Sequence, residues 1–236
     1  MEQKAMTDAA ANYRRVSESV AEAAVKAGRS PQDVRLIAVT KFVEPERIEK
    51  AFEAGCTEVG ENRAQELKDK FEFFKANRQT VHFIGQLQLN KVKYLIGRAD
   101  LIQSADRLEV FREIDRLAGK QGIVQDCLVE INIGEEPQKG GIEPSDLNEL
   151  LKIISDMPNV FVKGLMCIPP AAGSEDARYY FKKQRELFEE ARELKLPNVS
   201  MELLSMGMSG DYISAIAEGA NMVRVGSAIF GPRHYN

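Results

Sequence analysis

The chain has 236 residues, of which 44% are hydrophobic and 29% are charged, and its formal net charge is −4. This length suits one large α/β domain or two small ones, and it is enough to bury a sizeable core. The weak negative charge argues against nucleic acid or an anionic membrane surface as the main partner.

The cysteines and the N-terminal segment suggest a compartment. The first residues, MEQKAMTDAAANYRR, lack the apolar stretch of a signal peptide, and no segment approaches the length of a membrane span. Three scattered cysteines, Cys56, Cys127 and Cys167, form no CxxC pair. We therefore expect reduced thiols in a cytoplasmic protein. With two histidines and no HxxxH spacing, we expect no metal site.

Helical periodicity opens the chain over residues 3–28, and Gly28 followed by Pro31 is typical of a helix end. Beyond it, short apolar runs alternate with amphipathic stretches. The expected strands are 34–40, 56–59, 80–84, 100–103, 124–131, 161–166, 199–204 and 222–225. The expected helices are 45–54, 62–77, 88–97, 106–120, 144–156, 174–194 and 211–219.

Eight strand–helix units without a linker or a shift in composition predict a TIM-type (β/α)8 barrel with an extra N-terminal helix, as a single domain over residues 1–236. A doubly wound open sheet is the alternative. That fold would show fewer strands and an early GxGxxG motif, and none follows the first strand. We therefore favour the barrel, with its functional residues at the C-terminal ends of the strands.

Lys41 stands where the first strand, LIAV, leaves the core. A lysine at a strand end is usually just solvated, so Lys41 alone indicates little. The last two loops, SMGMSGDY (205–212) and GSAIFG (226–231), are more specific, because each is rich in glycine and leads into a helix. Their backbone N–H groups, at Ser209 or Gly210 in the first loop, could hold a phosphate, although ordinary helix caps would look similar.

Closure of the barrel would bring these loops beside Lys41. An amine near a phosphate anchor fits pyridoxal 5′-phosphate, and it also fits a Schiff-base aldolase that acts on a sugar phosphate. Arg224 lies within the last strand between Val223 and Val225 and faces the opposite side from both. It could donate a hydrogen bond to the pyridine nitrogen, or it could form a salt bridge with a glutamate at a strand end.

Several motifs together resemble the pyridoxal phosphate homeostasis protein family, the single-domain relatives of the alanine racemase N-terminal barrel. They are LIAVTKF (36–42), GENRAQE (60–66), HFIGQLQLNK (82–91), GLMCIPP (164–170), LSMGMSGDY (204–212) and VRVGSAIFGPR (223–233). The resemblance covers nearly the whole chain. It differs at Val81, where relatives often have Trp, and at Leu89, where they have a small polar residue.

The resemblance implies a role for eight residues. Lys41 would carry the cofactor as a covalent aldimine, and Arg224 would contact the pyridine nitrogen. The phosphate cradle would be Ser209, Gly210, Gly226 and Ser227, and the pocket would also be lined by Asn62 and Met206.

The function that follows is a non-catalytic carrier, which buffers or delivers pyridoxal 5′-phosphate in intracellular vitamin B6 and amino acid homeostasis. Candidate recipients are apo forms of enzymes that use the cofactor, and we expect a monomer. An amino acid racemase is the alternative, but it needs a second acid/base group. Tyr212 is the only tyrosine near the expected site. The loop EEPQKGG (135–141) would close over the site or bind a partner.

Overall fold

The computed structural model of the chain describes residues 8–170 and 174–232, and within them eight parallel strands form a closed barrel. The strands are β1 (Arg35–Val39), β2 (Glu58–Glu61), β3 (Thr80–Phe83), β4 (Leu101–Ala105), β5 (Gln125–Ile131), β6 (Val160–Cys167), β7 (Val199–Ser205) and β8 (Met222–Val225). Strand β8 pairs with β1, which completes the ring. The predicted TIM-type barrel is thereby confirmed.

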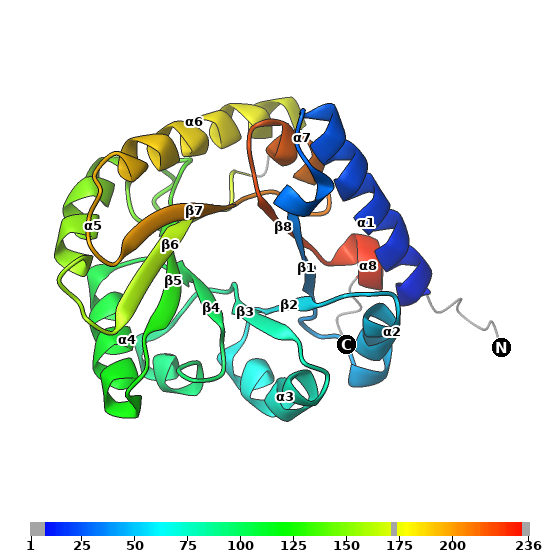
Figure 1. Cartoon of the computed structure of the whole chain (residues 1–236), viewed down its shortest axis with the longest axis horizontal. Helices are drawn as coiled ribbons and strands as arrows, with labels where there is room; N and C mark the ends of the chain where they lie inside the picture. Colours follow the sequence, from blue (N-terminus) through cyan, green and yellow to red (C-terminus); the bar gives the residue numbers. More distant parts are fainter. Residues whose placement is uncertain (1–7, 171–173, 233–236) are drawn as a thin grey trace.

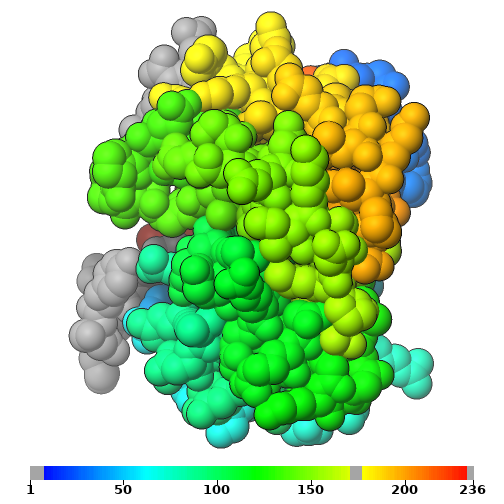
Figure 2. All heavy atoms as spheres, turned by 90° about the vertical axis from the view of Figure 1, so that its left-hand side faces the viewer, coloured from blue at the N-terminus to red at the C-terminus, as the bar shows by residue number. Residues whose placement is uncertain are grey.

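Helices surround the ring of strands (Figure 1). They are α1 (Ala9–Lys26), α2 (Pro45–Glu53), α3 (Ala64–Ala76), α4 (Leu108–Gln121), α5 (Leu147–Ile154), α6 (Ser174–Arg192), α7 (Tyr212–Ala217) and α8 (Ser227–Phe230), with 3-10 turns η1 (Pro31–Asp33), η2 (Leu89–Tyr94) and η3 (Pro144–Asp146). From the side, the green and yellow-green residues around α4 and α5 face the viewer (Figure 2).

Four expected elements differ from the structure, and one of them, the helix expected at 144–156, begins as the 3-10 turn η3 before α5. The second strand lies at 58–61 and not at 56–59, because the chain joins the sheet only after the exposed Thr57. The segment 88–97 forms the 3-10 turn η2, in which Val92 is the buried residue. The buried side chains of the whole segment, Val92, Leu95 and Ile96, lie in its second half, and so short an apolar stretch does not stabilise a longer α-helix. The expected first helix begins at Ala9, capped by Asp8, and positions 3–7 lie outside the described residues.

Two apolar clusters make up the core. The smaller one fills the barrel interior with side chains from alternate strand positions: Ile37, Leu101, Leu128, Met166 and Met222. The larger one lies between the strands and the helices and includes Val223 and Val225. Successive strand residues point to opposite faces, so these two valines place the intervening Arg224 inside the barrel.

Helix α1 closes one side of the barrel and packs against α7 and α8 (Figure 1). Its Asn12 Nδ2 donates to the backbone oxygen of Ile229, at 3.0 Å. Helix α1 therefore supports the two short helices that follow β7 and β8. In the described part of the chain, no helix has both the length and the apolar character needed to cross a bilayer.

Candidate functional site

Lys41 lies at the C-terminal end of the barrel, in the turn between β1 and α2, and it is half-buried. The turn closes where the backbone N–H of Val43 donates to the oxygen of Thr40, at 3.1 Å. Phe42 takes a positive φ of 59°, and its N–H donates to Glu66 Oε2 of α3, at 2.9 Å. Contacts on both sides therefore define the position of the Lys41 backbone.

A buried carboxylate supports this turn from the neighbouring strand. Glu61, the last residue of β2, is fully buried, and its Oε1 accepts hydrogen bonds from Thr40 Oγ1 (2.8 Å) and Lys70 Nζ (2.9 Å). The amine of Lys70 also donates to the backbone oxygen of Thr40, at 2.9 Å. Burial raises the pKa of Glu61, and Lys70 opposes that rise. We did not predict this cluster, although Glu61 and Glu66 belong to the GENRAQE motif (60–66).

Arg224 projects into the barrel from β8 and is 3% exposed. Its Nη1 donates to Ser205 Oγ at 2.5 Å, and its Nη2 donates to the backbone oxygen of Cys167 at 2.9 Å. Both acceptors belong to the last residues of their strands, β7 and β6. The guanidinium therefore lies at the C-terminal level of the sheet. Burial lowers the pKa of Arg224 from its ordinary value.

The register between β8 and β1 relates Arg224 to Lys41. Arg224 of β8 is paired with Ile37 of β1. Lys41 comes four residues after Ile37 and therefore lies nearer the C-terminal mouth of the barrel than Arg224 does. The alternative interpretation, a salt bridge from Arg224 to a glutamate, is not what the structure shows among the described residues, where Ser205 and Cys167 accept from the guanidinium. Glu130 of β5 nevertheless acts on the guanidinium electrostatically and favours its charged form.

The loops after β7 and β8 meet through Ser209. Its Oγ accepts long hydrogen bonds from the backbone N–H groups of Gly226 (3.3 Å) and Ala228 (3.5 Å), at the start of α8. Gly210 and Ser227 are exposed beside them. A Cβ added at Gly210 would meet nothing within 4 Å, so the space above this loop is open. The structure thus brings together the four residues predicted as a phosphate cradle.

The two remaining predicted residues have different surroundings. Asn62 follows β2, and its Oδ1 is buried and accepts no hydrogen bond from any residue that the structure describes. Met206 follows β7 and is fully buried, and its side chain belongs to the large cluster between strands and helices. A contact between Met206 and a cofactor stays a prediction.

Two carboxylates near the mouth were not predicted. Glu130 of β5 has its pKa raised to about 7, chiefly by burial and also by the neighbouring Asp106. Burial likewise raises the pKa of Asp106, which follows β4. A Cβ on Gly140 would lie 3.2 Å from Asp106 Oδ2, so the loop 134–142 approaches this pair. Their position at the C-terminal ends of β5 and β4 could have indicated them, but our prediction considered the polar residues of the glycine-rich loops instead.

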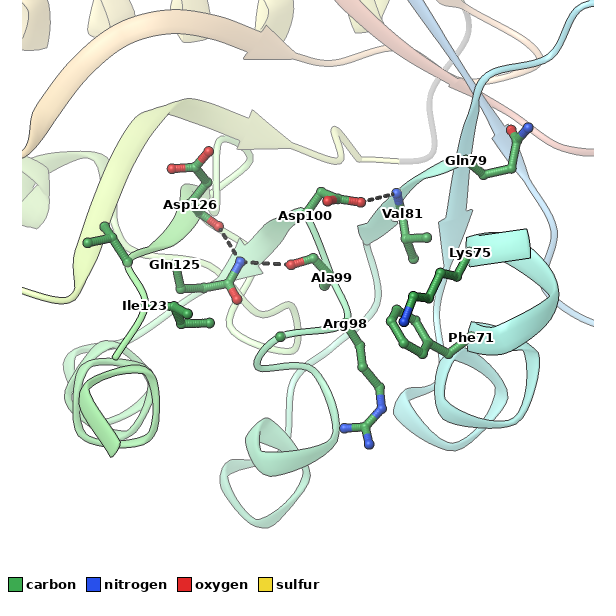
Figure 3. Close-up of a pocket in the computed structure, with 12 residues that line it drawn as sticks. Phe71, Lys75, Gln79, Val81, Arg98, Ala99, Asp100, Ile123, Gln125 and Asp126 are labelled. Atoms are coloured by element: carbon green, nitrogen blue, oxygen red, sulfur yellow. Dashed lines mark hydrogen bonds between the residues drawn. The ribbon is translucent and has the colours of Figure 1, made fainter. Parts of the chain in front are cut away.

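A cavity lies at the N-terminal end of the barrel, opposite the end that carries Lys41. It has a volume of about 440 Å³ and opens near the starts of β3, β4 and β5 (Figure 3). Lys75 and Arg98 both lie over the ring of Phe71, at 5.9 and 5.7 Å from its centroid. Asp100 accepts from the backbone N–H of Val81. These pairings explain the charged residues locally, and the cavity is remote from Lys41.

Comparison with known proteins places this architecture in a family. The profile of the family described as "Alanine racemase, N-terminal domain" matches residues 10–234. A relative from Aquifex aeolicus, "Pyridoxal phosphate homeostasis protein", is 46% identical over 222 residues, which cover 94% of this chain and 96% of the relative. The chain belongs to the pyridoxal phosphate homeostasis protein family.

Solved structures agree with this assignment. PipY of Synechococcus elongatus PCC7942, whose structure is described as having PLP bound, superposes on the chain with a TM-score of 0.79 and is 33% identical. The match covers 90% of this chain and all of PipY. The alanine racemase of Corynebacterium glutamicum has a TM-score of 0.74 at 14% identity and shows the shared fold alone. This chain covers 62% of that racemase.

Proposed function

We propose that this member of the family binds pyridoxal 5′-phosphate covalently through the ε-amino group of Lys41, and that it buffers the cofactor or delivers it to apo forms of the enzymes that use it. The observation that carries the proposal is the convergence of three groups at one barrel mouth. They are Lys41 after β1, the Arg224 guanidinium from the adjacent β8, and the Ser209 loop against the start of α8. The names of the A. aeolicus and Synechococcus relatives support the same cofactor.

The polar atoms at the mouth fit such a ligand. Ser205 and Cys167 accept from two of the five N–H donors of the guanidinium, so Arg224 keeps donors for a hydrogen bond to a pyridine nitrogen. The N–H groups of Gly226 and Ala228 make only long contacts to a neutral hydroxyl, and an anion would be a stronger acceptor. Asn62 Oδ1 is buried without a donor, as expected for a group that meets a ligand.

The chemistry of these residues favours holding the cofactor over turning over a substrate. An arginine donates a hydrogen bond to the pyridine nitrogen but rarely gives up its proton, so the ring stays a weak electron sink. The bound cofactor would supply an aldehyde that condenses with the Lys41 amine and releases water. Residues 1–236 are predicted to form the single domain that binds it.

A racemase needs a second acid/base group, and Tyr212 is not placed to supply it. The hydroxyl of Tyr212 donates to Ser19 Oγ of α1, at 2.8 Å. This contact directs the phenol toward the helix that packs on the outside of the barrel. The only tyrosine that we predicted near the site therefore supports α1 packing, and the carrier function is preferred.

The direct test compares visible absorption of the wild type and Lys41→Ala after incubation with pyridoxal 5′-phosphate. We expect an absorption band of the protein-bound cofactor in the wild type and its loss in the variant. Borohydride reduction followed by peptide mass spectrometry should place the added mass on Lys41. Lys120→Ala, which changes an exposed lysine of α4, is the matched control and should retain the band.

Two outcomes would contradict the proposal. A wild type that stays colourless with excess cofactor would exclude pyridoxal phosphate binding. A wild type that binds the cofactor and racemises L-alanine at ordinary enzymatic rates, with loss of activity in Lys41→Ala, would support the racemase instead.

A further inference from the structure

A row of buried polar side chains crosses the barrel interior beneath Arg224. Ser205 Oγ, which accepts from Arg224, donates to Gln103 Oε1 at 2.7 Å. Gln103 Nε2 lies 3.0 Å from His82 Nδ1, and His82 Nε2 lies 3.0 Å from Glu58 Oε2. These contacts link β8, β7, β4, β3 and β2 in one continuous chain of hydrogen bonds.

The chain runs from one end of the barrel to the other. Ser205 is the last residue of β7, whereas Glu58 is the first residue of β2. Ser205, Gln103 and His82 are all 1% exposed or less. The second carboxylate oxygen of Glu58, Oε1, accepts a hydrogen bond from Arg35 Nε at 2.8 Å, at the N-terminal end of the barrel. The site at the mouth is thus connected through the core to an ion pair at the far end.

The direction of every hydrogen bond follows from the arginine. A guanidinium can only donate, so Ser205 must accept from it and has its own proton to give to Gln103 Oε1. The Gln103 amide nitrogen can then only donate to His82 Nδ1. The remaining imidazole proton must reside on Nε2, where it is donated to the Glu58 carboxylate.

The carboxylate at the end of the chain is held ionised. Burial by itself would raise the pKa of Glu58, but the hydrogen bonds from His82 and Arg35 outweigh burial and lower it. Donors that all point the same way, from a cation toward an anion, polarise one another in a low-dielectric interior. Breaking one link leaves buried polar atoms without partners, which costs about 1–3 kcal/mol per group in proteins.

We propose that Ser205, Gln103 and His82 are positioning residues that orient the Arg224 guanidinium for the pyridine nitrogen, with the Glu58 carboxylate as the last acceptor of the chain. The cofactor part of this inference rests on the proposed function. Hydrogen bonds to Ser205 and to the Cys167 oxygen already fix the plane of the Arg224 guanidinium. The direction of its remaining N–H groups is therefore fixed as well. A preorganised donor loses little freedom when a ligand binds.

The first test uses the apo-protein and needs no cofactor. In a ¹⁵N-labelled His234→Gln variant, His82 is the only histidine. We expect the neutral tautomer protonated on Nε2, and slowly rotating Arg224 guanidinium resonances, identified by their loss in Arg224→Lys. The slowly rotating Arg224 signal should disappear in Gln103→Met, whereas the Glu58 carboxylate should keep the His82 proton on Nε2 in that variant. A proton on His82 Nδ1, or an Arg224 signal unchanged in Gln103→Met, would overturn the inference even if the protein holds no cofactor.

The second test measures the rate at which the loaded protein releases pyridoxal 5′-phosphate to an excess of an apo-enzyme acceptor. We expect Ser205→Ala and Gln103→Met to release it about tenfold faster than the wild type. Gln103→Glu keeps an acceptor for Ser205 and should restore part of the retention when its carboxyl is protonated to donate to His82. Leu128→Met alters the same barrel interior on β5, a strand that contributes no residue to the chain, and should release the cofactor at the wild-type rate.

The outcomes separate the two proposals. Wild-type release rates in both Ser205→Ala and Gln103→Met would overturn the positioning role while leaving cofactor binding intact. A wild type that binds no cofactor would defeat the proposed function, and the tautomer and guanidinium signals would still decide whether the chain orients Arg224.

Discussion

Lys70→Met should destabilise the fold and do so in a way that depends on pH. The substitution leaves the fully buried Glu61 without the amine that contacts its Oε1 at 2.9 Å. It also removes a donor from the backbone oxygen of Thr40, next to Lys41. A buried carboxylate without its charge partner is strongly unfavourable, because its desolvation is no longer compensated.

The magnitude follows from the burial of the pair. Removing one partner of a buried ion pair costs about 3–5 kcal/mol, and here the Lys70 side chain is 13% exposed, so we expect a loss of about 2–4 kcal/mol at pH 8. The pKa of Glu61 is already raised by burial in the folded state, and loss of Lys70 raises it further. The folded state then binds a proton more readily than the unfolded state, so stability falls as pH rises. At pH 5 the loss should be at least about 1 kcal/mol smaller.

Urea unfolding at pH 5 and pH 8 measures both effects. Glu61→Gln combined with Lys70→Met removes the buried charge and should recover much of the loss at pH 8. Lys68→Met, which changes an exposed lysine of the same helix, should stay within about 0.5 kcal/mol of the wild type. An equal destabilisation by Lys70→Met at both pH values would refute the reasoning, because it would show that the charge of Glu61 is not the cause.

Other substitutions test the rest of the mouth. Arg224→Gln should speed cofactor release by about tenfold or more in the same release assay, since a charged donor is replaced by a neutral one; unchanged release would favour a purely structural role for Arg224. In urea unfolding, the stability of Glu130→Gln relative to the wild type should rise by about 1–2 kcal/mol when the pH is raised from about 5.5 to about 8.5. The raised pKa of about 7 means that ionised Glu130 destabilises the folded wild type at the higher pH. A pH-independent difference would contradict this. Gly207→Ala should cost about 1–3 kcal/mol in thermal or urea unfolding, since Gly207 has φ of 93° and an added Cβ would lie 2.6 Å from that of Ala215; an unchanged midpoint would show that the loop relaxes.

Local patterns in the sequence were sufficient for the barrel and for one side-chain direction. Eight apolar runs, each long enough for a strand, alternate with amphipathic segments, and strand alternation placed Arg224 opposite Val223 and Val225. These signals are local, because they depend on neighbours within a few residues. For the same reason the order of the elements was right, whereas η2 was mistaken for an α-helix.

The polar contacts at and beneath the mouth depended on tertiary structure. Ser205 and Gln103 are 102 positions apart in sequence, and His82 reads as an ordinary structural histidine until Gln103 and Glu58 are placed on either side of it. Barrel closure, strand register and rotamers decide such pairs, and no local pattern encodes them. The sequence alone therefore determined the strand order, the position of Arg224 on the opposite face from Val223 and Val225, and the loops that carry Lys41 and Ser209. Only the folded barrel decided which buried groups would hold them, because hydrogen bonds between distant strands exist only after the ring has closed.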